Sequence, residues 1–170
     1  METLEVQTMD ELMLLEALEQ NARLKVTDLA DILNSSEDEV RKTIDRLKKD
    51  KVICGYHTVI NWDKAHKEKV VALIEVNATP ERDKGYDSVA EQIVKYPEVS
   101  SLYLMSGKYE FTVIIKGKTM REVAEFVGSK LAPINGVKGT VTSFVLKQYK
   151  IEGVLLDEQK ASQTRLKVTP

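Results

Sequence analysis

The stretch VSSLYLMSGKYEFTVIIK, residues 99–116, decides the fold of the C-terminal half of this chain. Val99–Met105 and Tyr109–Lys116 are both rich in β-branched and aromatic residues, which favour the strand conformation. Between them stands Ser106-Gly107-Lys108, a short polar turn that contains a glycine. Two such runs separated by a short glycine-containing turn predict a β-hairpin.

Outward from the hairpin, the pattern alternates between helices and strands on both sides. Pro97 ends the helix before the hairpin, because the residue before a proline avoids the α conformation. Thr119 and Glu122 have the spacing of a capping box at the start of the helix after it. The flanking strand, helix, helix and strand are predicted at Val70–Val76, Asp83–Tyr96, Met120–Leu131 and Val137–Tyr149. The order β-α-β-β-α-β is the split βαβ, or ferredoxin-like, arrangement.

The N-terminal part of the chain predicts short helices that carry their own start signals. Met9–Gln20 is expected to form the first helix, and Thr8 with Glu11 has the spacing of a capping box. Thr27 is expected to cap the second helix, which Asn34-Ser35 ends.

A third helix follows and is predicted to lead into an extended segment. Ser36 and Glu39 form another capping-box pair at its start. Its apolar residues are spaced i, i+4 and i+7, which places them in one buried stripe: Val40, Ile44 and Leu47. Val52–Trp62 is rich in β-branched and aromatic residues and is expected to be extended. Three short helices followed by a strand are typical of a winged-type helix-turn-helix domain.

The fold class expected from these elements is α+β, with two domains of different architecture. Residues 1–51 are expected to form the helix-turn-helix domain, and residues 52–66 an extended linker. Residues 67–152 are expected to form the ferredoxin-like, ligand-binding and dimerisation domain, followed by a polar tail at 153–170.

Composition excludes several classes of protein. Of the 170 residues, 42% are hydrophobic and 31% are charged, which is typical of a globular protein. No apolar run approaches the length of a membrane span. The first ten residues carry acids and no Lys or Arg, so no secretory signal is expected there. A single cysteine, Cys54, rules out a disulfide framework and fits a reducing cytosol.

The net charge is −2 and unevenly divided along the chain. Residues 1–62 hold 8 Lys and Arg against 13 Asp and Glu, a balance of −5, and the remainder has a balance of +3. A DNA-binding domain normally carries a basic footprint. The acidic N-terminal part is therefore an argument against DNA binding.

Four groups of residues, in this order and spacing, give the sequence its resemblance to the Lrp/AsnC, or feast/famine, transcriptional regulators. The groups are Asp10…Leu14-Leu15…Leu18 with Asn21-Ala22-Arg23 and Asp28-Leu29-Ala30; Ser36…Val40…Ile44-Asp45-Arg46-Leu47…Asp50 to Tyr56; Tyr96-Pro97-Glu98-Val99 with Met105 to Glu110; and Gly136-Val137…Thr140-Val141-Thr142…Lys150. The resemblance covers roughly residues 8–152.

The chain departs from the family pattern at several positions. The family usually has a basic residue where Thr43 stands, a turn glycine where Lys51 stands and an aspartate where Glu110 stands. The first turn of the third helix, Glu37-Asp38-Glu39, is unusually acidic for an element that reads DNA.

The resemblance implies that the third helix is the recognition helix and lies in the major groove of double-stranded DNA. The DNA-binding residues are then expected to be Ser35, Ser36, Arg41, Lys42, Arg46 and Lys48. The alternative is a solvated helix face, with acids in the first turn and bases in the last turn because the helix dipole favours that arrangement. Carboxylates near base edges can accept hydrogen bonds from cytosine N4, but they repel phosphates.

The resemblance also implies an effector site at the predicted hairpin. Its residues are expected to be Ser106, Gly107, Lys108 and Glu110. A carboxylate suits the ammonium group of an amino acid, and amides of the turn suit its carboxylate. The alternative is an ordinary tight turn, in which Gly107 supplies a positive φ and the charged residues are solvated.

No catalytic, metal or cofactor site is expected. His57 and His66 have no further ligand at a useful spacing, and Cys54 is expected to be a small buried hydrophobe. The sequence contains no G-x-S-x-G motif, no P-loop and no Rossmann fingerprint.

These observations predict a cytoplasmic, sequence-specific transcriptional regulator that responds to an amino acid or a related small metabolite. The resemblance implies a homodimer, able to assemble into an octamer, on palindromic double-stranded DNA, with no contact to membranes. Two alternatives stay open. The acidic N-terminal part suggests a metabolite-binding oligomeric sensor that has lost DNA binding, and the ferredoxin-like scaffold could carry an enzyme, although no nucleophile–base pair supports one.

Overall fold

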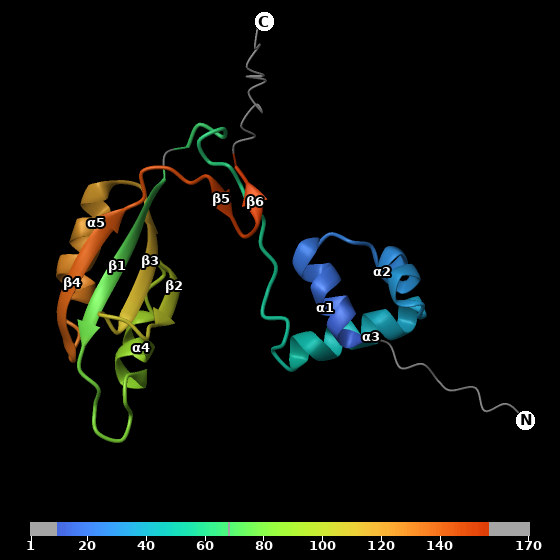
Figure 1. Ribbon diagram of the computed structural model, residues 1–170, viewed down its shortest axis with the longest axis horizontal. Helices are drawn as coiled ribbons and strands as arrows, with labels where there is room; N and C mark the ends of the chain where they lie inside the picture. The colour runs from blue at the N-terminus through green and yellow to red at the C-terminus, as the bar shows by residue number, and fades with distance from the viewer. Residues whose placement is uncertain (1–9, 68, 157–170) are drawn as a thin grey trace, which may run out of the picture. The chain divides into compact units, whose positions relative to one another are not determined.

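The computed structural model describes residues 10–67 and 69–156, which fall into two compact units. Unit 1 is Met1–Thr58 and unit 2 is Val59–Pro170. Unit 1 contains three helices, and unit 2 contains the sheet and the remaining helices (Figure 1).

Unit 1 begins with α1 (Glu11–Gln20), which Asp10 caps. The Asp10 carboxylate accepts hydrogen bonds from the amides of Leu12 and Met13, at 3.0 and 3.2 Å. Thr8, the predicted cap, lies outside the described residues. The predicted pairing of Glu11 with that cap is wrong, because Asp10 takes the capping role and the Glu11 carboxylate instead pairs with Arg46.

The second helix, α2 (Val26–Leu33), starts earlier than predicted. Its N-cap is Lys25 rather than Thr27, and the Asp28 carboxylate accepts from the Lys25 amide at 3.4 Å. The helix closes at Asn34, which adopts the left-handed conformation with φ 48°. The predicted break at Asn34-Ser35 is confirmed.

The third helix, α3 (Glu37–Lys49), has the predicted cap. The Ser36 hydroxyl accepts from the Glu39 amide at 3.3 Å, while the Glu39 carboxylate accepts from the Ser35 hydroxyl at 2.6 Å. The predicted apolar stripe is also confirmed, because Val40 and Leu47 are buried and Ile44 packs against them. The core of unit 1 consists of Leu14, Leu18, Leu29, Ala30, Leu33, Val40 and Leu47.

The chain after α3 does not form the paired strand of a wing. The amides of Val52 and Ile53 both donate to the Leu47 carbonyl, which ends the helix, and residues 54–60 have no assigned strand. Cys54 is exposed, so the expectation that it is a buried hydrophobe is wrong. Within the described part of unit 1, the domain therefore consists of the three helices and an unpaired connecting segment.

Unit 2 is built on a four-stranded antiparallel sheet. Its strands are β1 (Val70–Ala78), β2 (Val99–Leu104), β3 (Phe111–Gly117) and β4 (Val137–Phe144). They lie in the order β2-β3-β1-β4, and β2 and β3 form the predicted hairpin. The chain order is β1-α4-β2-β3-α5-β4, which is the predicted ferredoxin-like arrangement.

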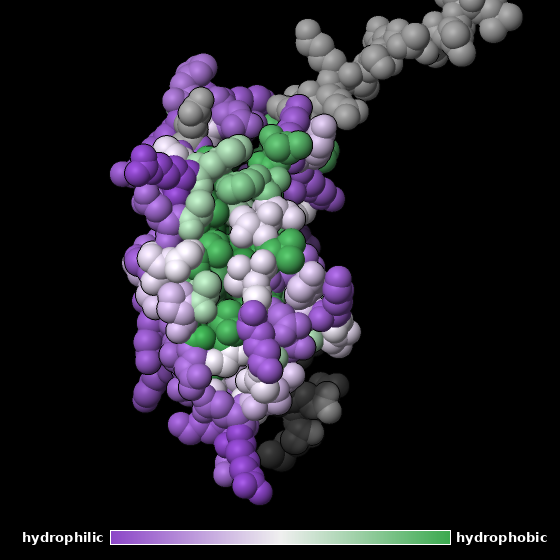
Figure 2. All heavy atoms as spheres, turned by 90° about the vertical axis from the view of Figure 1, so that its left-hand side faces the viewer, coloured by the Kyte–Doolittle hydropathy of each residue, from purple (hydrophilic) through white to green (hydrophobic). Residues whose placement is uncertain are grey.

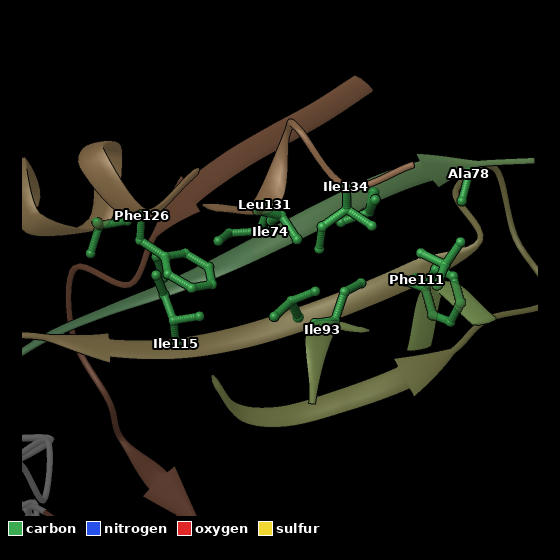
Figure 3. Close-up of a cluster of buried hydrophobic side chains, with 13 residues drawn as sticks. Ile74, Ala78, Ile93, Phe111, Ile115, Phe126, Leu131 and Ile134 are labelled. Atoms are coloured by element: carbon green, nitrogen blue, oxygen red, sulfur yellow. The ribbon is translucent and has the colours of Figure 1, made fainter. Parts of the chain in front are cut away.

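The helices of unit 2 supply the side chains that cover one face of this sheet. They are α4 (Asp87–Ile93) and α5 (Met120–Phe126), and α5 continues as a π-helix, η1 (Val127–Leu131). Every second residue of the central strands points into the core between sheet and helices (Figure 3). The core consists of Ala72, Ile74, Val76, Ala78, Val89, Ile93, Phe111, Val113, Ile115, Val123, Phe126, Leu131 and Ile134.

The predicted boundaries of α4 and β4 are too wide. The helix expected from Asp83 starts at Asp87, because Asp83 and Gly85 adopt positive φ angles of 72° and 58° in a turn closed by a bridge between Glu81 and Gly85. The strand expected to reach Tyr149 ends at Phe144. The local pattern of hydrophobic residues does not show where these turns begin, so the predicted elements extended into them.

A small hairpin follows β4 and lies partly within the expected polar tail. It joins β5 (Lys150–Ile151) to β6 (Val154–Leu155), so residues 153–156 are structured rather than a tail. Asn61 binds this hairpin, since its side-chain amide donates to the Leu156 carbonyl at 2.8 Å.

On the side of unit 2 that carries β4 and α5, apolar residues form a band bordered by hydrophilic ones (Figure 2).

Candidate DNA-binding and effector sites

The exposed face of α3 lies opposite the buried stripe and carries both signs of charge. Its first turn holds Glu37, Asp38 and Glu39, and its last turn holds Arg46, Lys48 and Lys49. The amphipathic pattern fixes this orientation, because Val40 and Leu47 point into the core of unit 1. The face therefore offers donors and acceptors to a partner instead of a uniform basic surface.

Two of the predicted DNA-binding cations are already paired within unit 1. Arg41 lies 3.3 Å from Glu37 one helical turn earlier, and both side chains are about half exposed. Arg46 pairs with Glu11 on α1 and lies 3.8 Å from Asp50. The hydrogen bond with Glu11 and the charge of that carboxylate raise the pKa of Arg46 above its ordinary value. Arg46 thus links α3 to α1.

The two predicted lysines differ in their surroundings. The Lys48 ammonium lies 5.5 Å from the centre of the Tyr56 ring, within cation–π range. Arg41, Lys48 and Tyr56 line one hollow of about 340 Å³ beside the three helices. Lys42 is exposed, and in the described part of the chain its ammonium has no hydrogen-bond or ion-pair partner.

Lys49 is a cation that the sequence analysis did not include. It lies seven residues after Lys42, which is close to two helical turns, so both point to the same side of α3. Like Lys42, it is exposed and unpaired among the described residues. The i, i+7 spacing of the two lysines is a signal that could have identified it.

The two predicted serines act in the structure as parts of the helix start. Ser36 caps α3, and the Ser35 hydroxyl holds the Glu39 carboxylate. Both contacts fix Glu39 in the first turn of α3: Ser36 accepts from its amide, and Ser35 holds its carboxylate.

The predicted effector residues lie on the connection between β2 and β3. Ser106, Gly107 and Lys108 are exposed, and the Lys108 ammonium lies 5.2 Å from the centre of the Tyr109 ring. Gly107 is not among the residues with positive φ, and a Cβ there would have nothing within 4 Å. The alternative of an ordinary tight turn is therefore wrong in one point, because Gly107 does not supply a positive φ.

Glu110 is integrated into the sheet by three hydrogen bonds. Its amide donates to the Val76 carbonyl at 3.1 Å, and its carbonyl accepts from the Met105 amide at 2.8 Å. Its carboxylate Oε2 accepts from the Ala78 amide at 2.8 Å. One carboxylate oxygen thus satisfies the end of β1, and in the described residues Oε1 has no hydrogen-bond partner.

A hollow in unit 2, which the sequence analysis did not identify, lies between α5, η1 and the strands. It has a volume of about 280 Å³, and Glu98, Ser129 and Lys130 are among the residues that line it. Lys130 pairs with Glu98, and the hydrogen bond it donates lowers the pKa of that carboxyl. Glu98 and Lys130 are 32 residues apart, so no local pattern in the sequence brings them together.

The described residues offer neither a metal site nor a membrane-spanning helix. That part of the chain contains no group of three or more His, Cys, Asp and Glu side chains placed to hold a metal ion. It also has no helix long and apolar enough to cross a membrane.

Both units match models of known protein domains. The AsnC-type helix-turn-helix domain model matches residues 12–48, and the Lrp/AsnC ligand-binding domain model matches residues 71–155. The chain is 41% identical to YugG of Bacillus subtilis, an uncharacterized HTH-type transcriptional regulator, over 92% of this chain and 95% of that protein. It is 33% identical to PH0140 of Pyrococcus horikoshii, another uncharacterized HTH-type transcriptional regulator, over 78% of this chain and 81% of that protein.

Solved structures show the same fold. The L-Met complex of the transcriptional regulator NMB0573 from Neisseria meningitidis aligns with a TM-score of 0.65 at 23% identity, over 83% of this chain and 90% of that chain. AsnC of E. coli aligns with a TM-score of 0.61 at 22% identity, over 84% and 95%. The matches to both domain models, and the 41% identity to an HTH-type regulator along nearly the whole chain, show that this protein belongs to the Lrp/AsnC family of transcriptional regulators.

Proposed function

We propose that this regulator binds double-stranded DNA through α3 and changes that binding when an amino acid or a related small metabolite occupies unit 2. One observation carries the proposal. The same chain contains an AsnC-type domain with an exposed third helix and an Lrp/AsnC ligand-binding domain. We place the protein in the cytoplasm, without catalytic activity, cofactor or metal.

The DNA-binding surface that the geometry supports best is the outer side of α3. Lys42 and Lys49 are its unpaired cations among the described residues, and both can reach phosphates. Arg41 is held by Glu37, so binding a phosphate through Arg41 requires exchange of that partner. Ser35, Ser36, Arg46 and Lys48 complete the proposed surface by fixing the helix start and its contacts to α1 and Tyr56.

The acidic first turn should make binding to DNA of arbitrary sequence weak. Changing Glu37 to Gln and Asp38 to Asn together is expected to strengthen non-specific binding, because it removes repulsion from phosphates and frees Arg41. Lys42→Ala is expected to weaken binding to all sequences and to reduce the salt dependence by about one phosphate contact. Fluorescence anisotropy with labelled duplexes over a salt series measures both effects.

Lys95→Ala in unit 2 is the matched control, since this exposed lysine lies outside α3. It should bind DNA like the parent. If the acidic double variant and Lys42→Ala both bind like the parent, α3 does not contact DNA. If the parent binds no genomic fragment even at low salt, the protein is a metabolite sensor that has lost DNA binding.

For the effector, we propose the β2–β3 connection, with Ser106, Gly107, Lys108 and Glu110 as its residues. The free oxygen of the Glu110 carboxylate can accept from an ammonium group, and the exposed amides or the Lys108 ammonium can bind a carboxylate. The L-Met complex of the Neisseria meningitidis regulator supports an amino acid as the ligand class.

Glu110→Gln separates effector binding from the structural role of this residue. The amide oxygen can still accept from the Ala78 amide, but the charge that faces an ammonium group is lost. Affinity for the amino acid is expected to fall about tenfold to hundredfold, with thermal stability close to that of the parent. Isothermal titration calorimetry against a panel of amino acids provides the measurement.

Glu110→Ala serves as the contrasting variant, because it also leaves the amide of the buried Ala78 without its partner and should be less stable. If Glu110→Gln binds the amino acid as tightly as the parent, Glu110 serves only the end of β1. If the parent binds no amino acid, the ligand belongs to another class.

A second copy of the chain is proposed to cover the sheet face that α4 and α5 leave open. Both helices contribute to the core on one side of the sheet, so the apolar side chains of the other face have no cover within the described part of unit 2. A two-fold dimer would present two copies of α3 to a palindromic site. We retain residues 1–51, 52–66 and 67–152 as the proposed functional division of the chain, and the β5–β6 hairpin extends the last part to residue 156.

A further inference from the structure

The open face of the sheet is defined by the residues that alternate with the core positions. On its two central strands this face consists of Val71, Leu73, Glu75, Asn77, Thr112, Ile114 and Lys116, and β4 adds Val141. Leu73 on the central strand β1 is 38% exposed, and Val141 on the edge strand β4 is 43% exposed. The face is therefore apolar at its centre and lacks a cover among the described residues of unit 2.

Glu75 on β1 and Lys116 on β3 are the charged residues that the two central strands place on this face. Strand alternation places each of them there, because their neighbours Ile74, Val76 and Ile115 are buried in the core. Glu75 is half-buried and Lys116 is exposed. Within the described part of the chain, neither side chain has a hydrogen-bond or ion-pair partner.

The strand register sets the distance and direction between these two charges. Glu75 is opposite Thr112, Leu73 is opposite Ile114, and Val71 is opposite Lys116. Glu75 and Lys116 are thus on neighbouring strands, offset by about 13 Å along them. The Leu73–Ile114 pair lies midway between them.

Consider a two-fold axis that is parallel to the sheet, perpendicular to the line from Glu75 to Lys116, and passes over the Leu73–Ile114 pair. This axis exchanges the positions of the two charges. Because neighbouring strands are about 4.8 Å apart, the diagonal from Glu75 to Lys116 is inclined by about 20° to the strands. The strands of two copies related in this way cross at about 40°, which is close to the aligned packing of two sheets. Sheets packed face to face are about 10 Å apart, a gap that a Glu and a Lys side chain can span together.

We propose that two copies of this chain pack open face to open face about this axis, so that Glu75 of each copy pairs with Lys116 of the partner subunit. The inference rests on the proposed self-association of unit 2 and adds how the two facing sheets are placed relative to each other. Each two-fold dimer then contains two identical ion pairs around an apolar centre formed by Leu73 and Ile114. The pairs offset the cost of burying Glu75, and they disfavour registers in which the two Glu75 carboxylates approach each other.

Charge reversal of the full-length protein tests this arrangement. Glu75→Lys and Lys116→Glu should each raise the dissociation constant of the dimer at least about a hundredfold, because each creates two contacts between like charges. The double variant should restore association, since its charges are exchanged but complementary. Mixing the two single variants should also restore it, as a heterodimer with opposite charges at both contacts. Sedimentation velocity over a dilution series measures each constant.

Controls separate this inference from the self-association on which it rests. Lys95→Glu reverses a charge away from the sheet and should dimerise like the parent. Circular dichroism should show the parent spectrum for every charge-reversal variant, because none of the substituted side chains belongs to the core. The ion pair is overturned if the single reversals dimerise like the parent, or if the double variant and the mixture stay dissociated. Leu73→Asp should dissociate the dimer whenever this face is the interface, so a dimeric Leu73→Asp contradicts self-association through the open face.

Discussion

Replacing Val40 by aspartate is expected to abolish DNA binding by unfolding unit 1. Val40 on α3 is fully buried in an apolar cluster to which all three helices contribute. A carboxylate buried there without a partner costs about 3 kcal/mol or more, which is a large part of the stability of a domain of this size. Anisotropy with labelled DNA and the helical circular dichroism signal should both fall.

Unit 2 should remain folded in this variant, because the two units have separate cores. Differential scanning calorimetry should therefore retain the transition of unit 2 and its shift by a bound amino acid. Val52→Asp is the control for folding, since Val52 is 53% exposed and its substitution should leave the helices intact. If Val40→Asp keeps the helical signal of the parent, the described packing of α3 is incorrect.

Phe111→Ala is expected to lower the free energy of unfolding of unit 2 by about 3–5 kcal/mol. Phe111 is 1% exposed at the start of β3, and its ring stands at 89° to that of Tyr86, with ring centres 5.9 Å apart. Truncation removes this aromatic contact and leaves a cavity beside Val76, the residue opposite on β1. Urea denaturation followed by circular dichroism measures the change.

Because Glu110 follows the β2–β3 connection directly and precedes Phe111, this variant should also lose amino-acid binding. The matched control is Tyr149→Ala, which removes an aromatic ring that is 59% exposed and should change stability by less than about 1 kcal/mol. Equal stabilities for Phe111→Ala and the parent would show that this ring does not belong to the core.

Hydrophobic periodicity was sufficient to predict most elements of the fold. The stripe of α3 and the alternation of the β2–β3 hairpin are local patterns, and the structure contains both. Element ends were less predictable. α1 starts after Asp10 and α2 after Lys25, because a cap depends on which nearby side chain reaches the free amides.

The candidate sites were only partly predictable from the sequence. Residues on α3 and on the β2–β3 connection could be named from their positions in the family pattern, but their partners could not. Arg46 pairs with Glu11, 35 residues away, and the Glu110 carboxylate binds the Ala78 amide, 32 residues away. Sequence spacing carries no information about such contacts, because they form only when separate elements pack together.

By itself, the sequence determined the class of this protein: three short helices, a β-α-β-β-α-β unit, and membership of one regulator family. These properties depend on side-chain periods of 3.6 and 2 residues and on turn residues, which are written locally along the chain. Only the tertiary structure decided which charges are free to act. Pairing within the fold occupies Arg41, Arg46 and one oxygen of Glu110, while strand register leaves Glu75 and Lys116 on an open face, because register and packing join residues far apart in sequence.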